Sequence, residues 1–362
     1  EPEKKVAEKA PEPAKPAEPA EKPKPAKKGP SLDKWKPAFD PSGAKYTFIV
    51  SNVSHPVLKG VYTGFAIRDE LWKRSNGQMY LDYKPFSMLG GEVEVLNQLQ
   101  MGAIQGMACS SVASTNLGPR FGLVNLPFLI NSFEKLDKFV NSGKLFDHFL
   151  MAMDHQGIMA VDIASYGNYG WATTVPVKTI EDAKKVKFRI AEAAVNKLSY
   201  QAWGFNPVVM PWPDVPVALK QGVITGLDHT LTVCSITKKF EVAKYFTELN
   251  YAQGLFIWLF NKAWYNKLPA DLQKILMETV RDMCAEARAA ARELVYSLRY
   301  TRAQAIEDGV HLILPIRRHK KALGGKANRF ENGLLPVFAV DKRMVGCCLA
   351  LLTVVADLAP LR

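Results

Sequence analysis

An aromatic, glycine-rich run is the part of this sequence whose residue types best suit the binding of a small molecule. Residues Tyr166 to Trp171 read YGNYGW. Flat rings and polar amides beside glycines are typical of a cleft wall, where backbone and rings approach a ligand closely. A tyrosine-bearing turn packed on a core would show the same pattern. Asn168, Tyr169 and Trp171 are therefore candidate ligand contacts.

Arg189 follows in a segment that reads as a helix and then a short strand. The helix begins at a threonine cap, Thr179, and the strand ends near Arg189. Ligands of α/β sheets bind outside the carboxyl ends of the strands. A planar guanidinium matches a carboxylate with two parallel hydrogen bonds. Arg189 is therefore a candidate carboxylate anchor, and a surface salt bridge is the alternative.

Sequence motifs for catalysis, nucleotides and metals are missing. Gly90-Gly91 and Gly324-Gly325-Lys326 lack the spacing of a phosphate loop, and there is no nucleophile elbow. The six histidines are dispersed, and the five cysteines show neither a disulfide framework nor zinc-ligand spacing. We expect no cofactor, no metal and no enzymatic activity. The competing hypothesis is a hydrolase or lyase in which Asp228 and His229 act as acid and base.

Alternating strands and helices would position these residues. Residues 46–50 and 79–83 read as strands with a helix over 57–75 between them. Gly90-Gly91 opens a helix that ends at Gly102, and residues 104–108 read as a third strand. This rhythm predicts an α/β fold with parallel pairing. Further along, residues 268–308 read as one long helix, started by Pro269 and stopped by Gly309.

Much of the formal charge of +12 lies outside the expected folded body. Residues 1–30 contribute +2 and residues 316–362 contribute +6, which leaves +4 for the rest of the chain. No RNA-binding or helix-turn-helix signature is present, so we expect no nucleic-acid partner. Residues 1–30 alternate Pro, Ala, Lys and Glu without an aromatic residue, and such a segment cannot offset its ordering entropy. We expect a disordered tether over residues 1–43.

Several blocks, taken in order and spacing, resemble the solute-binding proteins of tripartite ATP-independent periplasmic (TRAP) transporters, the DctP-like family. The resemblance runs from about Lys45 to Pro315. Its blocks are Leu89–Glu92 with Gln100–Gly102, Leu126–Leu129, Pro176–Arg189, and Val208–Trp212 leading to Ala218–Gly226. It implies a two-lobed α/β periplasmic binding protein fold, with strands crossing between the lobes and a long helix spanning both.

The same resemblance implies roles for particular residues. Arg189 falls on the arginine that clamps the ligand carboxylate, and Trp212 falls on an aromatic cleft position. His229, next to Asp228, replaces an amide that often touches the ligand. Further ligand contacts are expected in the first βα turn and just after a first-lobe strand, at Asn52, His55, Ser110 and Ser111.

Two departures from the family pattern bear on the ligand. Residues 225–229 read TGLDH where the family usually has a sequence of the DGQEN type, and no second cleft arginine precedes Pro176. A dicarboxylate would need that second cation. We therefore favour an aromatic or indole-type monocarboxylate. A C4-dicarboxylate or another small aliphatic acid is the alternative.

The resemblance also predicts how the chain is divided. Lobe I would comprise residues 44–166 and about 255–294, and lobe II residues 167–254 and about 295–330. The structure of the tail 331–362 stays open, since its apolar stretch is too short for a convincing membrane span. The chain begins at Glu1 without a signal-peptide region, so we expect a removed signal peptide. The location would be periplasmic, with the tether as a candidate link to the inner membrane.

The expected partners are a small organic carboxylate and the membrane subunits of a TRAP transporter, bound by a monomer. A ligand-sensing protein that presents the same fold to a receptor is the competing function.

Overall fold

A long mixed sheet forms the centre of the computed structural model, which describes residues 31–56, 59–296, 306 and 309–313. In spatial order its strands are β2, β1, β3, β9, β4, β7, β5 and β6, with β8 beside β4 and β10 beside β8. The strands are β1 Tyr46–Ser51, β2 Met79–Lys84, β3 Gly106–Ser110, β4 Ile158–Thr173, β5 Phe188–Ile190, β6 Val208–Val209, β7 Gly226–Thr230, β8 Tyr245–Thr247, β9 Gln253–Asn261 and β10 His311–Ile313.

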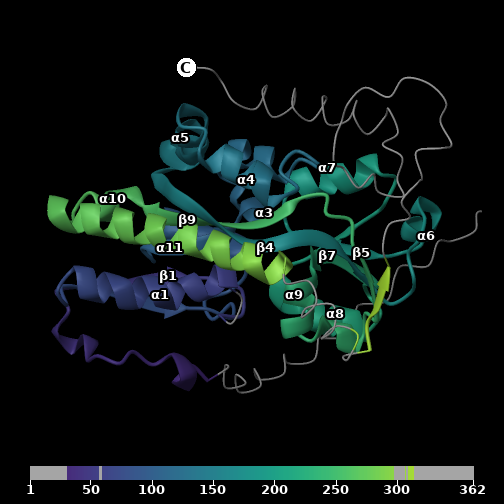
Figure 1. Ribbon diagram of the computed structural model, residues 1–362, viewed down its shortest axis with the longest axis horizontal. Helices are drawn as coiled ribbons and strands as arrows, with labels where there is room; N and C mark the ends of the chain where they lie inside the picture. The colour runs from purple at the N-terminus through teal and green to yellow at the C-terminus, as the bar shows by residue number, and fades with distance from the viewer. Residues whose placement is uncertain (1–30, 57–58, 297–305, 307–308, 314–362) are drawn as a thin grey trace, which may run out of the picture.

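Helices flank this sheet along its length (Figure 1). They are α1 Lys59–Arg74, α2 Glu92–Gln100, α3 Ser111–Ser114, α4 Phe133–Val140, α5 Lys144–Leu150, α6 Ile180–Lys184, α7 Ala194–Ala202, α8 Val215–Lys220, α9 Leu231–Ile236, α10 Lys262–Tyr265 and α11 Ala270–Tyr296. Short 3-10 turns add η1 Asp33–Trp35, η2 Pro41–Gly43, η3 Pro119–Asn125, η4 Met151–Gln156, η5 Trp212–Asp214 and η6 Lys239–Glu241. The mixed α/β architecture confirms the predicted fold class.

The strand β4 joins the two halves of the sheet. Its first part, Ile158 to Asn168, pairs antiparallel with β9, which in turn pairs with β3. Its last part, Tyr169 to Thr173, pairs with β7, and Trp171 to Thr173 also pair with β8. We call β1, β2, β3 and β9 the first half of the sheet and β5 to β8 the second half. A strand that changes partners in this way is the kind of crossing connection that the family resemblance implied.

Local sequence explains the helices that flank the binding region. In α2 the apolar side chains Val95, Leu96 and Leu99 are buried, and Glu92 lies in the first turn, where the helix dipole favours an anion. In α6 the Thr179 side chain accepts a hydrogen bond from the backbone N–H of Asp182, and the Asp182 carboxylate accepts one in return. This capping box fixes the start of the helix that leads into β5.

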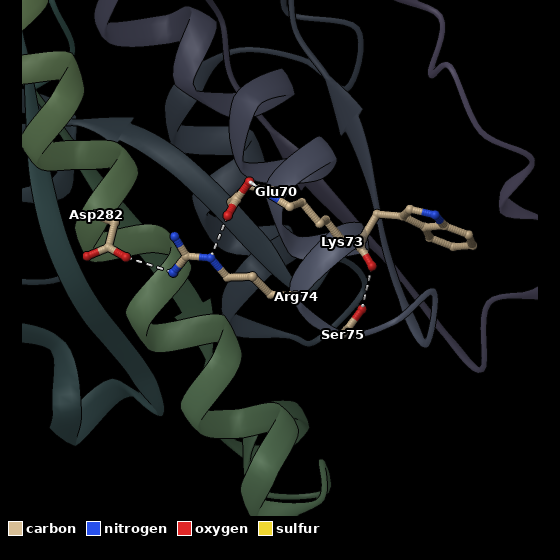
Figure 2. Close-up of polar contacts among 6 residues, drawn as sticks. Glu70, Lys73, Arg74, Ser75 and Asp282 are labelled. Atoms are coloured by element: carbon tan, nitrogen blue, oxygen red, sulfur yellow. Dashed lines mark hydrogen bonds and ion pairs between the residues drawn. The ribbon is translucent and has the colours of Figure 1, made fainter.

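The long helix α11 lies across the molecule, between α1 and the strand β4 (Figure 1). A buried stripe along it, which includes Leu272, Leu276 and Val280, belongs to a core cluster shared with both halves of the sheet. Figure 2 shows that Arg74 of α1 lies between Glu70 of the same helix and Asp282 of α11. The helix was predicted to run to Asp308, and residues 297–305 and 307–308 lie outside the described part.

The expected tether differs from the structure in its last residues. Trp35 stacks on Phe65 with ring centroids 5.7 Å apart, and Phe39 stacks on Trp72 at 4.5 Å. The guanidinium of Arg68 donates to the Trp35 carbonyl at 2.5 Å. Residues 31–43 therefore pack on α1, because their two aromatic rings offer apolar area that the first thirty residues lack. Residues 1–30 and the tail after residue 313 lie outside the described part.

Smaller differences concern the ends of elements. The third strand was expected over residues 104–108 and is observed as Gly106–Ser110, while the helix expected over 57–75 is observed as Lys59–Arg74. None of the helices in the described part of the chain is both long and apolar enough to cross a membrane.

Candidate functional site

One cavity lies where the two halves of the sheet meet, and it is bordered by side chains from both. Its empty volume is about 430 Å³, part of which is open to solvent. The first half and the turns that follow its strands contribute Val53, Ser54, Glu92, Ser110, Val112 and Phe256. The strand β4 contributes Tyr166 and Tyr169, and the second half contributes Arg189, Ala191, Asn196, Trp212, Asp228 and His229.

Arg189 lies in β5, and its guanidinium is held in place from one side. Nε and Nη2 both donate to the carbonyl oxygen of Met210, at 3.0 and 2.8 Å. The side chain is buried, and within the described residues no carboxylate forms an ion pair with it. Burial lowers the pKa of Arg189, while Asp228 and Glu92 act in the opposite direction. A buried cation with N–H groups left over can bind an anion.

Glu92 brings a carboxylate to the same cavity from the start of α2. Its two oxygens accept hydrogen bonds from the backbone N–H and the hydroxyl of Ser110, at 2.6 and 2.8 Å. Burial raises the pKa of Glu92, although the hydrogen bonds from Ser110 and the charge of Arg189 oppose the shift. The Ser110 hydroxyl also caps α3, so the loop between β3 and α3 fixes where this carboxylate lies.

Asp228 lies in β7 and is buried among tyrosines. Its carboxylate accepts a hydrogen bond from the Tyr251 hydroxyl at 2.9 Å, and Asn196 donates to the same oxygen at 3.5 Å. Burial raises the pKa of Asp228, and Arg189 and Tyr251 partly offset this. Neighbouring donors therefore engage one oxygen of Asp228, whereas Ser110 engages both oxygens of Glu92.

His229 and Trp212 border the cavity beside Arg189, with their ring centroids 4.7 Å apart. The Nδ1 atom of His229 accepts a hydrogen bond from the backbone N–H of Thr230 at 2.9 Å, so the neutral ring carries its proton on Nε2. Burial, Arg189 and Lys239 hold the pKa of His229 well below its ordinary value. The ring therefore acts as a hydrogen-bond donor through Nε2, and Nδ1 is not available as a base.

Two cations lie against the Trp212 ring. The Arg189 guanidinium is 5.5 Å from the ring centroid and the Lys239 ammonium is 4.8 Å from it. Lys239 is buried, and its ammonium donates to the Thr237 carbonyl at 3.3 Å. Trp212, which borders the cavity, thus also contacts a second buried cation, Lys239, which does not border it and which sequence reasoning missed.

The two halves touch beside the cavity. The Asn116 side chain, after α3, donates to the Glu192 carbonyl at 2.8 Å. Val112 forms a small buried cluster with Ala193 and Val195. These few contacts close the cavity on one side without a large core of their own.

Six of the eleven residues predicted for the site border the cavity: Ser110, Tyr169, Arg189, Trp212, Asp228 and His229. The other five do not. Trp171 is in the core, where it packs on Phe188 and donates to the Tyr200 hydroxyl. Ser111 is buried and bonds to Asn125.

The remaining three hold neighbouring backbone or strands. The Asn52 side chain donates to the Ala108 carbonyl and accepts from the Ser54 N–H, which fixes the turn after β1. His55 packs edge-on against the rings of Trp35 and Phe86, which also contact each other. Asn168 accepts from Gln253 and so links β4 to β9.

One glycine of the aromatic run, Gly170, and one glycine of the neighbouring strand β9, Gly254, are explained by packing. A side chain at Gly170 would come within 2.6 Å of both the Phe246 ring and the Thr247 carbonyl oxygen. The Tyr166 ring lies directly over Gly254. Gly170 and Gly254 thus permit other groups to approach the backbone closely. These groups belong to β8 and to Tyr166 rather than to a ligand.

Sequence reasoning also missed Glu92, Tyr166 and Asn196 as bordering residues. Tyr166 is part of the YGNYGW run, and Glu92 ends the block Leu89–Glu92, so both lay within segments already singled out. No signal in the sequence marks Asn196. Across the described ranges, no group of three His, Cys, Asp or Glu side chains is placed to hold a metal ion.

Two of the proteins similar to this chain are periplasmic binding proteins. The chain is 26% identical over 218 residues to the 2,3-diketo-L-gulonate-binding periplasmic protein YiaO of Escherichia coli K12, a match that covers 59% of this chain and 65% of that protein. It is 28% identical over 222 residues to the C4-dicarboxylate-binding periplasmic protein DctP of Rhodobacter capsulatus, covering 61% and 66%. The chain thus spans just under two thirds of the length of these relatives.

Solved structures share the fold. A TRAP periplasmic solute-binding protein from Shewanella oneidensis, with bound succinate, has a TM-score of 0.73 at 21% identity and covers 87% of this chain and 95% of that one. A Bordetella pertussis receptor that binds pyroglutamic acid has a TM-score of 0.73 at 19% identity, covering 86% and 95%.

The model of the family described as bacterial extracellular solute-binding protein, family 7, matches residues 50–323. This match confirms the resemblance drawn from the sequence blocks. The chain belongs to the DctP family of bacterial extracellular solute-binding proteins.

Proposed function

We propose that this protein is the ligand-capturing subunit of a TRAP transporter and that it binds an organic carboxylate on Arg189. The single observation that carries the proposal is a buried guanidinium at a cavity between two sheet halves, with no ion pair among the described residues. A buried cation without a carboxylate partner is costly, and a bound carboxylate would relieve that cost. Two similar structures bind small organic acids, succinate and pyroglutamic acid.

The rings around the cavity support a ligand with a flat apolar part. Tyr166, Tyr169, Trp212 and Phe256 all border the cavity. With Trp171 in the core, Trp212 is the wall against which we place that part of the ligand. A monocarboxylate remains our favoured class, and the C4-dicarboxylate named for one of the relatives is the alternative.

We propose that the ligand is captured by closure of two lobes about β4 and β9. Bordering residues come from both halves, and the contact of Asn116 with Glu192 is a small surface that could separate on opening. The captured ligand would then be delivered to membrane subunits in the periplasm by a monomer that performs no chemistry on it. A receptor-facing sensor would bind its ligand in the same way. The two functions are distinguished by measuring growth on the ligand after the membrane subunits have been deleted.

The test of the carboxylate anchor is Arg189→Lys. Lysine keeps the charge but replaces the planar fork with one ammonium, so it cannot reproduce both the paired bonds to the Met210 carbonyl and a bidentate bond to a carboxylate. The binding free energy should weaken by about 2–5 kcal/mol, or about 30-fold to several thousand-fold in affinity. Titration calorimetry against succinate, pyruvate, phenylacetate and indole-acetate gives the affinities. The control is Arg281→Lys on the exposed side of α11. Unchanged affinity in the Arg189 variant would withdraw the anchor.

Closure is tested on the same samples by small-angle scattering. The radius of gyration should decrease when the tightest-binding acid of the panel is added. An unchanged value at saturation would indicate a rigid pocket.

A further inference from the structure

The charged side chains that border the cavity do not suit a ligand that carries only negative charge. They comprise one cation, Arg189, and two carboxylates, Glu92 and Asp228. His229 is neutral, because burial and the nearby cations hold its pKa low. The second buried cation, Lys239, lies against the Trp212 ring and does not border the cavity. A ligand that brought only negative charge would meet two carboxylates in a partly closed, weakly screened space.

Glu92 is a preformed acceptor within this cavity. Ser110 holds both of its oxygens through the backbone N–H and the hydroxyl, so the carboxylate has a fixed position. Each oxygen keeps acceptor capacity beyond those two bonds. No lysine or arginine among the described residues forms an ion pair with it. Asp228 differs in its position, since it lies in β7, in the same half of the sheet as Arg189, and one of its oxygens accepts from the Tyr251 hydroxyl and Asn196.

Glu92 and Arg189 also lie on different halves of the protein. Glu92 begins α2 and is held by the end of β3, whereas Arg189 lies in β5. A ligand whose carboxylate rests on Arg189 would therefore present its other end to groups of the first half. Burial raises the pKa of Glu92 because it disfavours the charged carboxylate. A hydrogen-bond donor on the ligand would stabilise that charged form and offset the shift.

We propose that Glu92 is a specificity-determining residue that selects small zwitterionic acids, in which a cationic nitrogen accompanies the carboxylate. The carboxylate binds Arg189, and an N–H of the nitrogen donates to the Glu92 carboxylate. The inference rests on the proposed function, because it takes the carboxylate anchor at Arg189 as given. It deepens that function by excluding dicarboxylates and plain fatty acids as preferred ligands.

The experiment compares acids that differ only in one group. Butyrate, 4-hydroxybutyrate, 4-aminobutyrate and succinate share a four-carbon chain. A second pair, propionate and alanine, makes the same comparison with a shorter distance between the nitrogen and the carboxylate. Calorimetry with the full chain should show at least one amino acid binding tenfold or more tightly than its parent acid and than succinate. A charge-assisted hydrogen bond is sufficient for a factor of that size.

Glu92→Gln supplies the decisive variant. Glutamine keeps the shape and can still accept from the Ser110 N–H, so the fold should persist while the negative charge is lost. The advantage of the amino acid over its parent should fall by at least tenfold. Glu94→Gln, an exposed glutamate on the same helix, is the matched control and should leave every affinity unchanged.

The possible outcomes distinguish failure of the role proposed for Glu92 from failure of the carboxylate anchor at Arg189. Equal binding of succinate, butyrate and 4-aminobutyrate overturns the inference, as does an amino-acid preference that survives Glu92→Gln. A hydroxy acid that equals the amino acid also overturns it, because a cation would then not be required. If these acids bind in an Arg189-dependent way without the predicted order, the carboxylate anchor stands and only the role of Glu92 fails. If none binds at millimolar concentration, the proposal for Glu92 is rejected, while Arg189 is still judged on the aromatic panel.

Discussion

Two ion pairs on α11 should contribute very differently to stability. Arg288 bonds to Asp162 of β4 at 2.9 Å and also donates to the Ile163 carbonyl at 2.5 Å, and the two charged side chains are 11% and 7% exposed. Arg74 bonds to Asp282 at 2.7 Å, with side chains 30% and 56% exposed (Figure 2). The first pair connects the long helix to the strand that joins the two sheet halves. The second is largely in water.

The expected magnitudes follow from this difference in burial. Arg288→Met leaves a buried carboxylate whose pKa burial already raises, so unfolding free energy should fall by about 3–5 kcal/mol. Asp282→Asn breaks an exposed pair and should cost about 0.2–1 kcal/mol. Adding Asp162→Asn to Arg288→Met should recover part of the loss, because the uncompensated charge is then removed.

Urea denaturation with linear extrapolation gives the unfolding free energy of the wild type and of each variant. The Asp162→Asn single variant completes the cycle for the buried pair. Equal losses for the buried and exposed pairs, or no recovery in the double variant, would refute the assignment of Arg288 as the partner that compensates Asp162.

Two further results are expected. Since the pKa of Glu92 is raised in the folded state, the folded protein binds the extra proton, and stability contributed by this group falls as pH rises from its ordinary value near 4.5 toward neutrality. Glu92→Gln should therefore flatten the decline in unfolding free energy over that range, and parallel curves for variant and wild type would contradict it. A chain that begins at Lys45 should lose about 2 kcal/mol of stability relative to one that begins at residue 31, because the Trp35 stack is removed, whereas removal of residues 1–30 alone should change the thermal midpoint little.

The fold was largely accessible from the sequence because local signals agree with the tertiary structure. Apolar alternation and flanking turns located β1 and β2, and glycines located the ends of α2. The third strand was placed two residues early, since the apolar Ile104 is buried in the turn before the ladder begins. Apolar residues mark burial, but they do not mark where backbone pairing starts.

The site was only partly accessible, and the reason is geometric. Tyr169 and Trp171 share a face of β4 by strand alternation, yet two residues advance the chain by about 7 Å, which carries Trp171 past the cavity into a cluster of rings. Glu92 and Lys239 were missed because an isolated charge in a sequence is usually solvated. Only the folded chain shows that Ser110 hydrogen-bonds Glu92 and that the Trp212 ring contacts Lys239.

The place of β9 in the sheet has a consequence for how the protein can be made. β9 inserts between β3 and β4, although every strand from β5 to β8 precedes it in the chain. Until Gln253–Asn261 has arrived, β3 and β4 face each other across an empty position with unpaired edges, which are templates for aggregation. The first half is therefore not an independent folding unit, and its assembly depends on contacts between residues far apart in the chain, which slow folding. A chaperone that keeps the chain extended until it has been delivered whole would suit this order of strands better than stepwise folding of one half at a time.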